Sequence, residues 1–302
     1  MNNELTPIAL FVYNRPEHTQ KTIQALAANI LADKSLFYVF SDGPKSESDY
    51  AKVNEVRKVV KEASGFAQKI IFESSSNKGL ADSVISGVTQ VINEHSKVIV
   101  MEDDLVSSPS FLSFMNEALS FYGDNKNIFS ISGFCYPVQI PHDYKDGVFA
   151  IHRPASWGWA TWEDRWFKTD WEVKDFPIFK KDKQAQNKFN KCGEDLTPML
   201  FAQMTGRVDS WAVRWAYSHF KNDAYSVFPV KSLINHIGSD STGTHFKSTS
   251  KFEVNIENNV FLPRLVKLTQ SNELIEMNIK KFFQLSLIRK AINFVKYFKI
   301  LN

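Results

Sequence analysis

The amino-acid sequence predicts an α/β fold in which helices flank a mostly parallel sheet. In the N-terminal third, short apolar runs alternate with stretches whose apolar residues recur at helical spacing. The apolar runs are continuous, as in strands that are covered on both faces. Polar and charged residues follow each run directly, and ligands of such sheets gather at the carboxyl ends of the strands. These observations together predict an active site at that edge of the sheet.

The composition is that of a globular protein with one large domain or two small ones. The chain has 302 residues, of which 43% are hydrophobic, and a formal net charge of +3. The hydrophobic content can fill a substantial core. The small net charge excludes the overall basic field that is typical of nucleic-acid binders. We therefore expect no nucleic acid among the partners.

Several features favour a cytoplasmic protein. The two cysteines, Cys135 and Cys192, follow no pattern that would indicate a disulfide framework or a zinc site. The N-terminus lacks the basic start and apolar core of a secretion signal. No apolar run is long enough to cross a bilayer. We expect a reducing compartment and no membrane span.

The first two predicted strands each end in a charged residue. Residues 8–13 are expected to form a buried strand that runs into Arg15, before a helix over residues 19–29. Residues 37–40 are expected to form the second strand, and Asp42 follows it. Because the ends of parallel strands share one edge of the sheet, we expect Arg15 and Asp42 on the same side of the molecule.

The next elements continue the alternation. The pattern predicts a charged helix over residues 50–63, a strand over residues 70–72, a polar loop over residues 74–79 and a helix over residues 80–93. Neither of the two commonest glycine-rich phosphate loops occurs in the chain. If a nucleotide binds here, a metal and side chains must hold its phosphates.

The fourth predicted strand ends in three acids. Residues 98–101 are apolar, and Glu102, Asp103 and Asp104 follow them. Carboxylates at this place could bind a divalent cation. They could equally form a polar turn that caps the helix expected over residues 109–122, and this stretch alone leaves both interpretations open.

A tryptophan-rich stretch follows a strand that we expect over residues 128–132. Trp157, Trp159 and three further tryptophans lie within residues 157–171, with Gly158 among them. Such a cluster predicts either a rigid pocket wall or a satellite core under a long loop.

Two more helices are expected, over residues 184–203 and 208–220. Asp209 lies in the first turn of the second, where an aspartate is more often an N-cap than a catalyst.

Residues 229–245 are a strand-like run followed by a loop that carries His236 and His245. Either histidine could contact a metal or phosphate, or could simply be solvated.

The C-terminal residues 278–302 include several basic residues and no acidic one. Apolar residues recur at three- and four-residue intervals, which predicts a basic amphipathic helix. Such a helix can lie on an anionic membrane surface, and this is the interpretation we favour. It could also dock on a partner chain or on its own domain.

Six motifs, in order along the chain, carry a resemblance to a known family. They are VYNRPEHT, FSDGP, NKGL, VIVMEDDLVSSPSFLSFM, SWGWATWEDRW and DSWAVRW. Their order resembles that of bacterial glycosyltransferases of the GT-A fold. More distantly it is similar to N-acetylglucosaminyltransferase I and the protein O-mannose N-acetylglucosaminyltransferase, in which the D-x-D motif is written E-D-D. The resemblance covers Ile8 to about His245, matches poorly between Cys135 and His152, and leaves out the tail from about Asn278.

The resemblance implies a GT-A catalytic domain over residues 1–265, with a Rossmann-like sheet that binds a nucleotide-sugar. The amphipathic pattern, which lies outside the resemblance, predicts a helical tail over residues 266–302. The resemblance also implies that Asp104 binds Mn²⁺ or Mg²⁺ and that Asp209 is the catalytic base. The other positions that it assigns to donor binding are Arg15, Asp42, Lys78, Glu102, Asp103, Trp157, Gly158, Trp159 and His245. The cation would balance the charge that grows on the leaving diphosphate.

The activity so implied is an inverting, metal-dependent sugar transfer. The donor would be a UDP-sugar, with UDP-N-acetylglucosamine as one candidate. The resemblance does not extend to the acceptor, which we expect to be a hydroxyl of a surface polysaccharide or a lipid-linked glycan near the inner face of the plasma membrane. Two alternatives remain open: a nucleotidyltransferase that makes a sugar nucleotide, and a non-catalytic protein that binds a membrane surface.

Overall fold

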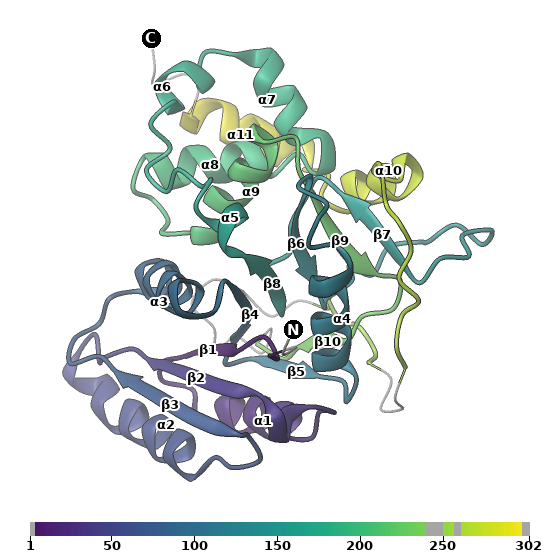
Figure 1. Ribbon diagram of the computed structural model, residues 1–302. Coiled ribbons are helices and arrows are strands. Elements are labelled where there is room, and N and C mark those ends of the chain that lie inside the picture. The colour runs from purple at the N-terminus through teal and green to yellow at the C-terminus, as the bar shows by residue number, and fades with distance from the viewer. Residues whose placement is uncertain (1–3, 239–249, 257–260, 298–302) are drawn as a thin grey trace.

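The computed structural model describes residues 4–238, 250–256 and 261–297, and its centre is an eight-stranded sheet (Figure 1). In sheet order the strands are β3 (Gln68–Glu73), β2 (Leu36–Ser41), β1 (Ile8–Val12), β4 (Lys97–Glu102), β8 (Trp159–Trp162), β6 (Ile128–Ser132), β9 (Tyr225–Pro229) and β7 (Val148–Ile151). A second, two-stranded sheet pairs β5 (Leu105–Ser107) with β10 (Ile234–His236).

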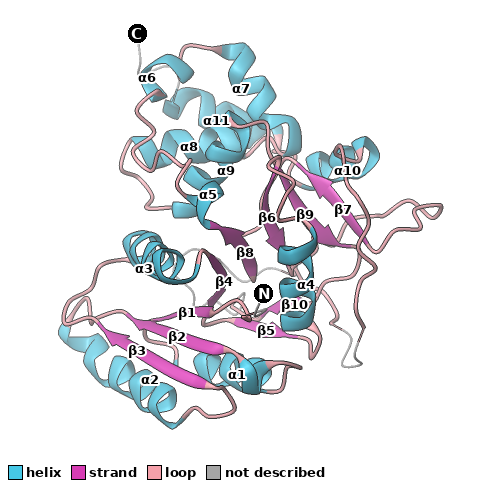
Figure 2. Ribbon diagram, in the orientation of Figure 1, coloured by secondary structure: helices cyan, strands magenta, loops and turns pink. Residues whose placement is uncertain are grey.

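The helices alternate with the strands in the first half and cluster in the second. They are α1 (Pro16–Ala27), α2 (Tyr50–Glu62), α3 (Leu80–His95), α4 (Phe111–Phe121), α5 (Glu163–Trp166), α6 (Phe176–Phe179), α7 (Lys183–Phe189), α8 (Leu196–Met204), α9 (Trp211–Lys221), α10 (Glu273–Phe282) and α11 (Leu287–Tyr297). Figure 2 shows α6 to α9 and α11 gathered at one end of the molecule, beyond β8.

The predicted fold class, an α/β protein with a mostly parallel sheet flanked by helices, is confirmed. β1 pairs in parallel with β2 and with β4, and β2 pairs in parallel with β3. In the other half, β8 runs antiparallel to both β4 and β6, β9 runs parallel to β6, and β7 runs antiparallel to β9. The carboxyl ends of β1, β2 and β4 therefore meet at one edge.

Side chains of β1 fill the core on both faces of the sheet. Ile8, Leu10 and Val12 belong to one buried cluster with residues of α1, α2 and α4, whereas Ala9 and Phe11 belong to another with residues of α3. Every residue of β1 is buried. This explains why the strand is continuously apolar in sequence instead of alternating with polar residues.

The prediction of a single helix over residues 184–203 is wrong. The chain forms α7, a short 3₁₀ turn η3 (Asn190–Cys192) and α8. The break lies at Gly193, whose φ is 151°, and a Cβ there would lie 2.3 Å from Nη1 of Arg153. The close packing of the Arg153 guanidinium against the backbone therefore accounts for the interruption.

Three of the short strands were not expected from the sequence. β5, β7 and β8 are only three or four residues long, and β8 lies inside the tryptophan-rich stretch. Their hydrogen-bond partners lie far away in the chain, so local periodicity gives little signal for them.

The C-terminal segment forms two helices where one was expected. Ile275 and Ile279 of α10 are fully buried in the main core. After a break, α11 packs through Tyr297 in a cluster with residues of α8 and α9. The division of the chain at residue 266 stays a prediction. No helix in the described part of the chain is both long and apolar enough to span a bilayer.

Candidate active site

The acidic turn after β4 is held in place by α1. Thr22, which is fully buried, donates its hydroxyl to the carbonyl oxygen of Asp103 at 2.8 Å. The same hydroxyl accepts a hydrogen bond from the backbone N–H of Leu105 at 3.2 Å. Asp103 and Asp104 are themselves buried. The turn is thus a fixed structure that presents carboxylates at the edge of the sheet.

Arg15 forms ion pairs with two of the three acids. It lies just before α1, and its Nη2 donates to Oδ2 of Asp104 at 2.8 Å and also to Oδ1 of Asp103. Burial acts against its charge, but the two carboxylates raise the pKa of Arg15 above its usual value. Arg15 is therefore a permanent cation between the first and fourth strands.

The three acids have different proton affinities. Burial, with the neighbouring charges of Asp104 and Asp103, raises the pKa of Glu102 to about 8. Burial raises the pKa of Asp103 to about 6, although Arg15 opposes the change. Burial acts to raise the pKa of Asp104 as well, but hydrogen bonds and charges from His236 and Arg15 bring it below its usual value. Asp104 is the acid most firmly kept as a carboxylate.

His236 lies directly beside Asp104. The antiparallel pairing of β10 with β5 sets His236 opposite Leu105, and its Nε2 lies 3.2 Å from Oδ2 of Asp104. Its ring stacks on the indole of Trp157 with centroids 4.3 Å apart. The sequence marked His236 as a loop histidine that could contact a metal or phosphate, but the resemblance assigned only His245 to the site. The strand-like residues before His236 were the available signal, but their pairing partner was not predictable.

The residues around Asp104 fit a hard divalent cation. Within the described ranges, Oδ1 of Asp104 is buried and has no hydrogen-bond partner. A Cβ at Gly238 would lie 2.1 Å from Oδ2 of Asp104, so only glycine allows the chain to pass this close. Carboxylate oxygens with an imidazole nitrogen nearby suit Mn²⁺, and Mg²⁺ prefers the oxygens alone. The capping role that the sequence left open for the acids is not needed to explain this arrangement.

Asp42 organises the loop between β3 and α3. Its carboxylate accepts hydrogen bonds from the backbone N–H groups of Gly43, Lys78 and Gly79 and from the side chain of Asn77, all at 2.8–3.0 Å. These four bonds use the whole accepting capacity of a carboxylate. Asp42 thus shapes the edge of the site, and a bond to a nucleotide base would have to replace one of them.

Asp209 lies just before α9 and is not its N-cap. The N-cap is Ser210, whose hydroxyl accepts from the backbone N–H of Val213 at 3.3 Å. The side chain of Asp209 is 58% exposed, and its Oδ1 lies 3.4 Å from Nη2 of Arg214. A carboxylate that is open to solvent and not used in capping is free to act in chemistry.

One cavity of about 380 Å³ brings most of these side chains together. Among its lining residues are Arg15, Asp42, Glu102, Asp103, Asp104, Trp157, Asp209 and His236. Lys78 is exposed and lines a neighbouring hollow beside Asp42 instead. His245 lies outside the described residues.

The tryptophan motif divides between the site and the core. Trp157 lines the cavity, whereas Trp159 is fully buried and stacks on Trp211 with ring centroids 5.1 Å apart. Gly158 separates them with a positive φ of 60°, and a Cβ there would lie 2.6 Å from the Ile234 side chain. Gly158 and Trp159 thus support the wall of the cavity without lining it, so both earlier interpretations of the cluster apply to different members.

A second cavity, of about 520 Å³, adjoins the first. Glu102, Trp157 and Asp209 line both of them. From there the second cavity extends between α8 and α11. Asp209 therefore lies where two binding spaces meet, which is the place for a group that acts on two substrates.

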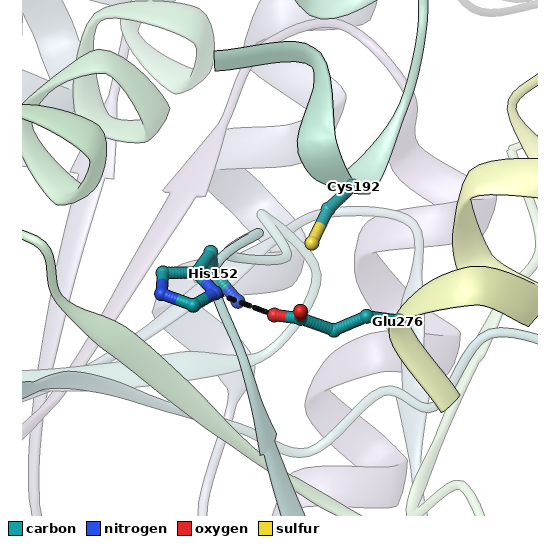
Figure 3. Close-up of side chains that lie close together, drawn as sticks. All are labelled: His152, Cys192 and Glu276. Atoms are coloured by element: carbon teal, nitrogen blue, oxygen red, sulfur yellow. Dashed lines mark hydrogen bonds and ion pairs between the residues drawn. The ribbon is translucent and has the colours of Figure 1, made fainter. Parts of the chain in front are cut away.

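A separate cluster anchors α10 to the rest of the molecule (Figure 3). The potential ligand atoms of His152, Cys192 and Glu276 all lie within 4.8 Å of one another. The carboxylate of Glu276 already bonds Nδ1 of His152 at 2.5 Å and pairs with Nζ of Lys191 at 2.9 Å. Burial raises the pKa of the Cys192 thiol, which disfavours the thiolate that a metal requires. We interpret this cluster as a structural ion-pair network.

Comparisons with known proteins give only weak similarities. No protein-family model matches the chain, and no curated protein matches it. Among solved structures, the chain is similar to S. aureus TarS at 11% identity and a TM-score of 0.42, over 78% of this chain and 37% of that one. It is also similar to the mannosyltransferase PcManGT from Pyrobaculum calidifontis in complex with GDP-Man and Mn²⁺, at 12% identity and a TM-score of 0.38, over 73% and 72% of the two chains. This chain spans little more than a third of the length of TarS, and neither likeness assigns a substrate or a residue role.

Proposed function

We propose that the protein is a metal-dependent, inverting glycosyltransferase that uses a nucleotide-sugar donor. One observation carries the proposal: a buried acidic turn with its paired arginine and an exposed aspartate line the same cavity at the carboxyl edge of the sheet. The motif order that resembles GT-A glycosyltransferases supports the same activity. It favours a UDP-sugar, with N-acetylglucosamine as the first sugar to test.

Each group in the cavity has a distinct task in this reaction. Asp104, with His236 beside it, would hold Mn²⁺ or Mg²⁺, which offsets the negative charge that develops on the leaving diphosphate. Arg15 donates to the diphosphate once it releases the acids, because a guanidinium suits phosphate oxygens. Glu102 and Asp103 contact the sugar or ribose hydroxyls. Asp42 supports the loop that borders the donor.

Asp209 would take the proton of the attacking acceptor hydroxyl. Its position at the junction of the two cavities allows it to contact a molecule in either one. A single displacement needs such a base and no covalent enzyme intermediate. The donor then occupies the cavity of the acidic turn, and the acceptor occupies the neighbouring one.

The acceptor proposed here is a surface-polysaccharide or lipid-linked glycan at the inner face of the plasma membrane. Support comes from α11, whose outward side chains are apolar and exposed. Leu287 is 83% exposed and Ile288 is 74% exposed. A helix with this outer surface and with lysines and arginines beside it suits an anionic membrane.

The test is donor binding and transfer with purified protein and a panel of UDP-sugars, with and without Mn²⁺. We expect binding of at least one UDP-sugar, strengthened by Mn²⁺, and loss of transfer in Asp104→Ala and on chelation. The matched control is Asp124→Ala, which removes an exposed aspartate away from both cavities. Transfer that survives both Asp104→Ala and chelation would refute the metal assignment.

A further inference from the structure

The second cavity is lined by groups of both charges. The carboxylates of Glu102 and Asp209 line the part that it shares with the donor cavity. Arg207, Arg289 and Lys296 also line it, and the last two belong to α11. A ligand in this cavity would therefore meet a carboxylate that can act as a base and three cations.

These three cations have no carboxylate partners among the described residues. No ion pair joins any of them to an acid in the described ranges, although other arginines and lysines nearby are paired. The one further acid in the cavity lining, Asp195, is engaged by the guanidinium of Arg153 in two bonds of 2.8 Å. The three cations are thus not neutralised by ion pairs, and they attract anions.

The ring of Tyr297 contacts two of the cations. The guanidinium of Arg207 lies 5.2 Å from the ring centroid, and Nζ of Lys296 lies 5.4 Å from it. Tyr297 is buried at the contact of α11 with α8. Residues from two separate parts of the chain thus bring positive charge to the same part of the cavity lining, and a bound anion would be attracted to both.

Two of the cations lie on the side of α11 that faces the cavity. Arg289, Asn293 and Lys296 recur at intervals of four and three residues, so they form one stripe of the helix, and all three line the cavity. The neighbouring stripe, about 100° around the helix, carries Ile288 and Val295, which are 74% and 56% exposed. The cations therefore lie at the border between the cavity and an exposed apolar surface.

Resting on the proposed function, we propose that the acceptor is an amphiphile with a phosphate group between its sugar and its apolar part. The groups in and beside the cavity match this chemistry: Asp209 would face the reacting hydroxyl, Arg207, Arg289 and Lys296 would bind the phosphate, and the exposed apolar residues of α11 next to the cations would contact the apolar part. Guanidinium and ammonium groups form charge-assisted hydrogen bonds with phosphate oxygens.

The test compares two soluble single-chain probes, octyl phosphate and octyl glucoside, below their micelle-forming concentrations. Chelator keeps divalent metal out of the donor cavity. We expect the wild-type protein to bind octyl phosphate more tightly than octyl glucoside in calorimetric titrations. The double variant Arg289→Gln with Lys296→Gln should bind octyl phosphate about tenfold more weakly or worse, with its affinity for octyl glucoside unchanged.

The matched control is Lys290→Gln. It removes one positive charge from the same helix, but Lys290 does not line the cavity and pairs with Glu194 at 2.8 Å. We expect this variant to bind octyl phosphate as the wild type does. Equal affinity of the double variant and the wild type for octyl phosphate would overturn the proposal.

Two further measurements distinguish this proposal from the proposed function and from binding to membrane headgroups. Titration with a UDP-sugar and Mn²⁺ should give the same affinity for the double variant as for the wild type. If no UDP-sugar binds even the wild type, the proposed function fails while the phosphate site can still be measured. If the double variant loses binding to phosphatidylglycerol vesicles but keeps its affinity for octyl phosphate, the cations contact membrane headgroups and the acceptor assignment is wrong.

Discussion

Asp209 differs from Asp103 and Asp104, which are buried, because its side chain is 58% exposed. It also takes no part in capping α9, since Ser210 performs that function. Its only ion pair in the described part of the chain is with Arg214, at 3.4 Å. A side chain in this position is expected to matter for turnover far more than for folding.

We predict that Asp209→Asn retains donor affinity and lowers the rate of transfer by at least about a hundredfold, the lower limit for loss of a general base. Steady-state kinetics and calorimetry with the same donor measure the two effects separately. Asp223→Asn is a suitable control, because Asp223 is 92% exposed and lies beside His152, away from both cavities. An unchanged transfer rate in Asp209→Asn would move the base to another residue.

Glu276 couples the stability of the fold to acidity. Burial acts to raise its pKa, but hydrogen bonds from His152 and Lys191 bring the pKa of Glu276 to about 2, from 4.5 for an ordinary glutamate. A carboxyl whose pKa is lower in the folded state stabilises the fold above its ordinary pKa. That contribution is lost as the pH falls from the ordinary pKa of 4.5 towards the pKa of about 2 that Glu276 has in the folded protein.

The shift corresponds to about 3 kcal/mol of folding free energy. We predict that Glu276→Gln lowers the free energy of unfolding at pH 7 and makes it less sensitive to acid between about pH 5 and pH 2. Urea unfolding at several pH values measures both effects. Glu117→Gln, at an exposed position on α4, is the matched control. A decline with acid as steep in Glu276→Gln as in the wild type would contradict the assignment.

At the scale of elements, α11 is packed with its apolar side outward. The buried residues of this helix are Asn293 and Tyr297, whereas Leu287, Ile288 and Val295 are more than half exposed. Docking of the apolar side on its own domain, one of the alternatives that the sequence allowed, is not what the structure shows. The exposed side instead stays available for a surface outside the molecule.

We predict that Leu287→Ser with Ile288→Ser weakens binding to anionic vesicles by about tenfold or more, because each side chain contributes about 1.5–3 kcal/mol when buried. Its free energy of unfolding should remain that of the wild type. Ile178→Ser, which changes a side chain of α6 that is 74% exposed, is the matched control. Truncation is a poorer test, since Ile279 of the preceding helix is buried in the core. Cosedimentation that does not change in the double variant would exclude α11 as the contact.

At the scale of the whole molecule, the site joins parts of the chain that are distant in sequence. The loops that follow β1 and β4 meet β10 at Asp104, and the loop before α9 contributes Asp209. A ligand that bridges these elements binds only the folded state. It should therefore stabilise the entire domain and not one loop.

We predict that Mn²⁺ together with UDP raises the melting temperature, with a gain of about 2.7 kcal/mol at a ligand concentration a hundred times the dissociation constant. Differential scanning calorimetry measures the shift. Asp104→Ala should abolish most of it, and Asp124→Ala should preserve it. If neither ligand changes the melting temperature of the wild type, this result would count against a donor site in this cavity.

The sequence by itself determined the first half of the fold and the acids of the site. Continuous apolar runs that end in Arg15, Asp42 and Glu102–Asp104 located the strands, because a strand buried on both faces must be apolar throughout. These ends meet at one edge because parallel strands all point in the same direction. The local pattern of apolar residues was sufficient to predict the fold wherever elements that are consecutive in sequence also lie next to each other in space.

Only the tertiary structure decided the rest. In the folded protein, β8 lies antiparallel between β4 and β6. The pairing of β10 with β5 places His236 next to Asp104. The cations of α11 line the second cavity. The tertiary structure also showed that the apolar side of α11 faces away from the core, whereas the periodicity had left a membrane, a partner chain and its own domain open as contacts. These features depend on contacts between residues far apart in the chain, and the periodicity of a segment records which side of it is apolar but not which surface that side will meet.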